Sequence, residues 1–87
     1  MISFSQTAGI QSSQIDRLDN LVRNIRSGDP RAIEATGPLS TGERLYVALA
    51  ANRCDLLRDD GYTIAQALAR LDEPWVAALI QRWQYVD

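Results

Sequence analysis

The fold of this chain is organised around one stretch of sequence, Ser40-Thr41-Gly42-Glu43-Arg44-Leu45-Tyr46-Val47-Ala48-Leu49-Ala50-Ala51-Asn52-Arg53. Ser40 followed three residues later by Glu43 predicts a capping box, in which each side chain accepts a hydrogen bond from the other residue's backbone N–H. From Leu45 to Ala51 the sequence is apolar without a break. A helix that is apolar on every side must be covered on most sides. We therefore predict a central helix over about 41–53, around which the rest of the chain packs.

Further helices are predicted on both sides of this central one. The segment 13–27 carries apolar residues at helical spacing and is followed by Gly28, a residue typical of helix ends. Thr63 with Gln66 forms a second start box for a helix over 63–71, and a last helix is expected over 74–84. Short helical turns are expected near 30–35 and 55–58. The fold class is all-α: one domain, 1–87, forming a small compact bundle of four main helices, with residues 1–9 as an N-terminal arm.

Finer expectations follow from the helical spacing. Asp19 and Arg23 are four residues apart and are expected to form a weak ion pair on the first helix. In the last helix, the apolar stripe runs through Val76, Leu79, Ile80 and Trp83. This spacing predicts that Trp83 is part of the core and that Trp75 lies at the edge of the stripe.

Composition limits the partners and the compartment. Nine basic residues, all of them arginine, face eleven acidic ones, for a net charge of −2. This balance provides no electrostatic footprint for nucleic acid or for an anionic membrane. The single cysteine cannot form an intramolecular disulfide, and no stretch resembles a signal peptide or a membrane span. We expect a cytoplasmic protein without a membrane partner.

Several chemistries are disfavoured by the residues present. The chain has no histidine, which removes histidine-based zinc sites and histidine acid–base catalysis. Gly37 and Gly42 have phosphate-loop spacing, but Glu43 stands where that loop requires lysine. The acidic residues before Gly61 lack the ligand pattern of a calcium loop. A catalytic pair formed by Asp72 and Glu73 stays open, although both are better explained as helix-start residues. We expect no metal, no cofactor and no enzyme activity.

Contact with another protein is the remaining function. Tryptophan, tyrosine and arginine dominate the energetics of protein interfaces. The candidate interface residues are Trp75, Tyr85, Arg82 and Phe4. The predicted function is that of a non-enzymatic adaptor or regulator that binds a protein partner and forms a homodimer. The alternative is a helix-turn-helix DNA-binding regulator that uses residues 63–84, although the acidic first turn of its second helix would meet phosphate.

Three segments of the chain together carry a resemblance to known proteins. They are Leu39-Ser40-Thr41-Gly42-Glu43-Arg44 with its apolar helix and Asn52-Arg53, then Gly61-Tyr62-Thr63-Ile64, then Glu73-Pro74-Trp75. In these segments the chain resembles short uncharacterised bacterial proteins, some of them carried on mobile or accessory DNA. The resemblance covers about the last half of the chain. It implies a bacterial source and brings no catalytic or binding residues with it.

Overall fold

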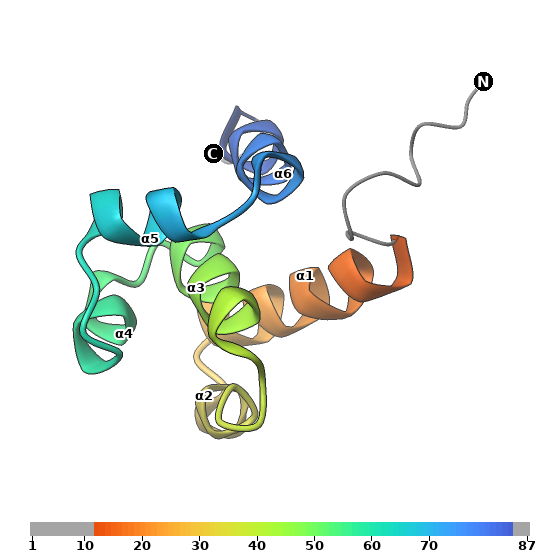
Figure 1. Ribbon diagram of the computed structural model, residues 1–87. Helices are drawn as coiled ribbons and strands as arrows, with labels where there is room; N and C mark the ends of the chain where they lie inside the picture. The colour runs from red at the N-terminus through yellow and green to blue at the C-terminus, as the bar shows by residue number, and fades with distance from the viewer. Residues whose placement is uncertain (1–11, 85–87) are drawn as a thin grey trace.

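The computed structural model describes residues 12–84, which form six helices and no strand (Figure 1). In chain order the helices are α1 (Ser12–Arg26), α2 (Pro30–Glu34), α3 (Thr41–Ala50), α4 (Cys54–Asp59), α5 (Ile64–Arg70) and α6 (Glu73–Gln84). The four main helices and the two short ones lie where the sequence predicts them, so the all-α bundle is confirmed. The predicted N-terminal arm lies outside the described residues.

Helix α3 is the centre of the bundle. It contacts α1, α4, α5 and α6, which surround it in Figure 1. Every side chain from Leu45 to Ala50 is buried, with Leu45, Tyr46 and Val47 completely shielded from solvent. The prediction that an all-apolar helix must be covered on most sides is therefore confirmed.

Side-chain caps that the sequence predicts set the first residues of α3 and α5. Ser40 Oγ accepts a hydrogen bond from Glu43 N at 3.2 Å, and Glu43 Oε1 accepts one from Ser40 N at 3.0 Å. Thr63 and Gln66 make the same reciprocal pair at the start of α5. Both predicted boxes are confirmed. They satisfy backbone N–H groups that a helix leaves without intrahelical partners.

The end of α3 is set by Asn52, which adopts a left-handed backbone conformation with φ of +58°. Arg53 N donates to Ala48 O at 2.9 Å and Asn52 N donates to Leu49 O at 3.0 Å. This pair of bonds is a Schellman motif. It ends the helix at Ala50, three residues before the predicted end, because the apolar pattern does not reveal a left-handed asparagine.

Substitutions at Asn52 should separate backbone strain from side-chain contacts. Asn52→Ala is expected to lower the free energy of unfolding by about 1 kcal/mol, because a left-handed conformation is unfavourable for a residue with a Cβ atom. Asn52→Gly should be at least as stable as the wild type, because glycine adopts this conformation without strain. Urea unfolding of the two variants measures the difference. Equal stability of the alanine and glycine variants would contradict this explanation of the helix end.

The two tryptophans of α6 exchange the roles that the sequence predicts for them. Trp75 is only 9% exposed and packs edge-on against Tyr46, with ring centroids 5.3 Å apart. Trp83 is 39% exposed. The inward stripe of α6 runs through Trp75, Leu79 and Arg82, at positions i, i+4 and i+7. The predicted stripe is therefore right for Leu79, which is buried, and for Val76, which packs against the core, but wrong for Ile80 and Trp83, which are exposed.

One smaller prediction is also corrected. Asp19 pairs with Arg82 and not with Arg23, which instead donates to Asn20 on its own helix. The Asp19–Arg82 pair joins α1 to α6, two segments far apart in the sequence, and helical spacing does not report such contacts. Cys54 is exposed at the start of α4.

Candidate functional site

A hollow on the described surface lies at the C-terminal end of α3. We call it the α3-end pocket, and its volume is about 590 Å³, within the range of ligand-binding pockets. Five of the six helices or their ends contribute to it. Its lining residues are Arg26, Ala48, Leu49, Ala50, Ala51, Asn52, Arg53, Cys54, Leu57, Ile64 and Trp83.

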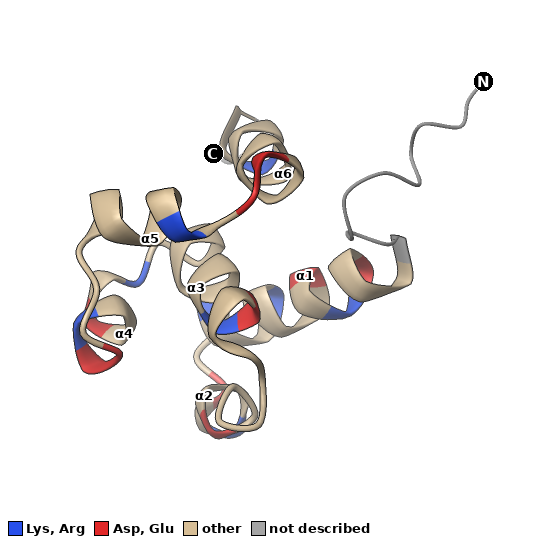
Figure 2. Ribbon diagram, in the orientation of Figure 1, with Lys and Arg blue, Asp and Glu red and all other residues tan. Residues whose placement is uncertain are grey.

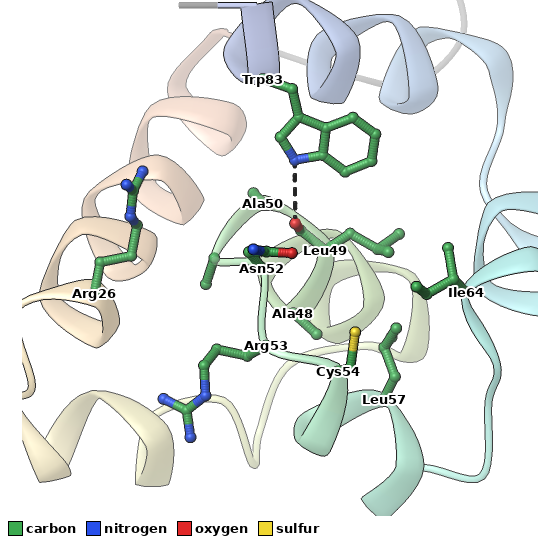
Figure 3. Close-up of a pocket in the computed structure, with 11 residues that line it drawn as sticks. Arg26, Ala48, Leu49, Ala50, Asn52, Arg53, Cys54, Leu57, Ile64 and Trp83 are labelled. Atoms are coloured by element: carbon green, nitrogen blue, oxygen red, sulfur yellow. Dashed lines mark hydrogen bonds between the residues drawn. The ribbon is translucent and has the colours of Figure 1, made fainter. Parts of the chain in front are cut away.

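The α3-end pocket has one apolar side and one polar side (Figure 3). Leu57 and Ile64 form the apolar side, whereas Arg26 lies across the pocket from Ile64. The Trp83 ring stands above the end of α3, where its Nε1 donates a hydrogen bond to Leu49 O at 3.2 Å. This bond holds the ring at the pocket although the side chain is partly exposed. The pocket can therefore accommodate a molecule that is apolar at one end and polar at the other.

An apolar patch adjoins this pocket. The large hydrophobic side chains that are exposed among the described residues are Ile64 at 49%, Ile80 at 48% and Trp83 at 39%. Ile80 and Trp83 are three residues apart on α6, so their side chains are neighbours on the helix surface. Trp83 and Ile64 both line the pocket. We call these three residues the α5–α6 apolar patch.

The two arginines of the pocket differ in their partners. The Arg53 guanidinium donates two hydrogen bonds to the Asp55 carboxylate, at 2.9 and 2.8 Å. The hydrogen bonds from Arg53 lower the pKa of Asp55 to about 2, so this pair stays ionised at neutral pH. Arg26, in contrast, forms no ion pair with any carboxylate of residues 12–84. It is exposed at the end of α1, so its charge is available to a ligand.

A second polar cluster joins α1, α3 and α6 away from the pocket. The Tyr46 hydroxyl donates to Asp19 Oδ1 at 2.6 Å, and Arg82 Nη2 donates to Asp19 Oδ2 at 2.8 Å. Burial, and then the hydrogen bond to Asp19, raise the pKa of the Tyr46 hydroxyl above its ordinary value. The phenol is therefore held as a neutral donor. Every polar atom of this cluster has an internal partner, so its role is to fasten α6 to α1 and α3.

Two of the four residues predicted for the interface, Trp75 and Arg82, lie among the described residues. Trp75 is buried inside the chain, which corrects its expected position at the surface. Arg82 is half-buried and held by Asp19. Phe4 and Tyr85 lie outside the described residues. The exposed large apolar side chains are instead Ile64, Ile80 and Trp83. The sequence pattern missed Ile80 and Trp83 because it assigned both to the apolar stripe of the last helix.

Among residues 13–84 every charged side chain is at least partly exposed, and no three metal-ligating side chains cluster among the described residues. Acidic and basic residues occur together on α1, α2, α3, α4 and α6 (Figure 2). Across α1 to α6 no helix has both the length and the apolar character needed to cross a membrane.

Comparisons with models of known protein families, with curated proteins and with solved structures find no match to this chain. The resemblance to short bacterial proteins therefore stays a prediction.

Proposed function

We propose that this protein is a non-enzymatic protein–protein interaction module, an adaptor or regulator that also self-associates. The observation that supports this proposal is the α5–α6 apolar patch. Large aliphatic and aromatic side chains that stay exposed next to a hollow are typical of surfaces that another protein covers. The patch replaces the predicted set of Trp75, Tyr85, Arg82 and Phe4 as the proposed contact surface.

The size of the chain is a further argument for self-association. A domain of 87 residues buries only roughly 60 to 65% of the surface that its unfolded chain exposes. Covering the exposed parts of Ile64, Ile80 and Trp83 in a dimer would add apolar burial that a single copy lacks. We propose a homodimer through this patch, in a cytoplasmic protein.

Ile80→Glu is expected to remove self-association without unfolding the chain. The side chain is about half exposed, so glutamate at this position can remain hydrated in the single copy. In a dimer the same charge would be buried in an apolar contact, which is strongly unfavourable. Light scattering after size-exclusion chromatography at micromolar concentrations should give a dimer for the wild type and a monomer for the variant.

Gln81→Glu is the matched control, because it adds the same charge at the next position of α6, which is also exposed. Arg82 Nη1 donates a hydrogen bond to Gln81 Oε1 at 3.3 Å, and a glutamate oxygen can accept the same bond. This variant should have the mass of the wild type. A wild-type protein that is monomeric at all concentrations would remove the self-association part of the proposal. Affinity capture from the native host with wild-type and Ile80→Glu baits then tests the remaining part, binding of a different protein.

A helix-turn-helix DNA-binding regulator that uses residues 63–84 stays the second candidate. The observation in its favour is that α5 and α6 follow one another with only residues 71–72 between them. Against it, Glu73 is in the first turn of α6 and Arg82 is engaged by Asp19. Retention on heparin and a salt-dependent mobility shift with random DNA at low salt would favour this candidate over the protein-binding one.

A further inference from the structure

We propose that the α3-end pocket is a binding site for a small amphipathic carboxylate, a molecule with one carboxylate and a short aliphatic or aromatic body. In this arrangement the apolar body lies against Leu57, Ile64 and Trp83, and the carboxylate meets Arg26. Ile64 and Trp83 are also covered in the proposed homodimer, so the site is that of a single copy and the ligand should compete with self-association.

The apolar side of the pocket explains the body of the ligand. Ile64 is 49% exposed and Trp83 39% exposed, and both face the same hollow (Figure 3). Leu57, behind them, is nearly fully buried, so the hollow reaches down to the core. An aliphatic chain or ring placed there removes apolar surface of both partners from water, which is the main source of affinity in such pockets.

The charges at the pocket explain the carboxylate. Two arginines and no acidic residue line the hollow. Arg53 is already neutralised by Asp55, whereas Arg26 has no carboxylate partner among the described residues. The guanidinium group binds a carboxylate through paired hydrogen bonds. Asn52, also at the polar side, adds an amide donor. The whole chain carries a net charge of −2, so a preference for an anion would have to come from this local arrangement.

Cys54 provides a reporter for the occupied pocket. It is the only cysteine of the chain, it is exposed, and it lines the hollow. A molecule that fills the pocket should shield its thiol from a small uncharged reagent. The experiment therefore measures the rate of Cys54 alkylation by iodoacetamide, in the full chain, with increasing decanoate. Decylammonium, which has the same chain length and the opposite charge, is run beside it.

We expect decanoate to slow alkylation several-fold and saturably below the concentration at which it forms micelles, and decylammonium to protect much less. Arg26→Gln should require about tenfold more decanoate for the same protection, which corresponds to the loss of one good charge-assisted contact. Arg58→Gln is the matched control. It removes an exposed arginine of α4 that does not line the pocket, and it should behave like the wild type.

Three results would overturn the proposal. They are the absence of protection by decanoate, equal protection by decylammonium, and an Arg26→Gln variant that responds to decanoate as the wild type does. Circular dichroism at each decanoate concentration verifies that the helices stay folded. The Ile80→Glu variant is measured in the same way, because Ile80 does not line the pocket and this variant is expected to be a monomer. Its response to decanoate tests the pocket alone, so failure of that variant to respond overturns the ligand site and leaves the homodimer untouched.

Discussion

Leu45→Asp is expected to leave the chain unfolded at 25 °C. Leu45 has no solvent exposure and lies in the centre of α3, the helix that contacts α1, α4, α5 and α6. Removing the leucine side chain alone should lower the free energy of unfolding by about 2–5 kcal/mol. The unpaired carboxylate adds several kcal/mol more. A domain of this size has a total stability of roughly 4–13 kcal/mol. The helical circular dichroism signal and its cooperative thermal transition should both be lost.

Ile64→Asp is the control for this prediction, because it makes the same kind of change at a side chain that is 49% exposed. It should keep the helical signal and lower the free energy of unfolding by less than about 1 kcal/mol. A cooperative transition in Leu45→Asp near the wild-type midpoint would show that α3 is not the centre of the core. Comparable losses in both variants would lead to the same conclusion.

Asp19→Ala is expected to lower the free energy of unfolding by about 2–3 kcal/mol. Asp19 accepts hydrogen bonds from the completely buried Tyr46 and from Arg82, which lies at the inward face of α6. Its removal leaves the phenol without its acceptor and the guanidinium without its counter-charge. The side chains of Asp19 and Arg82 are 20% and 32% exposed, so water partly compensates and the loss stays below that of a fully buried pair.

Asp16→Ala is the matched control, because Asp16 is exposed on the same helix and forms no ion pair among the described residues. It should change the free energy of unfolding by less than about 0.5 kcal/mol in urea titration. Asp19→Asn should lie between the two, because its single amide oxygen can still accept from Tyr46, whereas the charge and the second acceptor that faces Arg82 are lost. If Asp19→Ala is as stable as Asp16→Ala, the cluster does not fasten α6 to the bundle.

Local signals in the sequence were enough to predict the helices. The capping boxes at Ser40 and Thr63 and the glycine after α1 act within a few residues of the chain, so their spacing alone indicates where a helix begins or ends. Burial of α3 was equally predictable, because seven successive apolar residues leave no side for water. The end of α3 was predicted less well, because asparagine takes the left-handed position only in some contexts.

The candidate site could not be predicted in the same way. Helical spacing shows which residues of α6 share a face, but it does not show which face the rest of the chain covers. The inward face is selected by two distant contacts, Trp75 against the Tyr46 ring and Arg82 on Asp19. These contacts turn Ile80 and Trp83 outward. An apolar pattern that leaves out arginine cannot predict that α6 turns its Arg82 side toward the bundle.

The amino-acid sequence is therefore sufficient to predict a bundle of four main helices and two short ones with α3 at its centre, because caps, helix breakers and apolar periodicity act locally. Which tryptophan is buried, which isoleucines stay exposed and which side chains surround the α3-end pocket became known from the three-dimensional packing. These features depend on how helices separated by many residues rotate against one another, and that rotation is set by a few contacts between them.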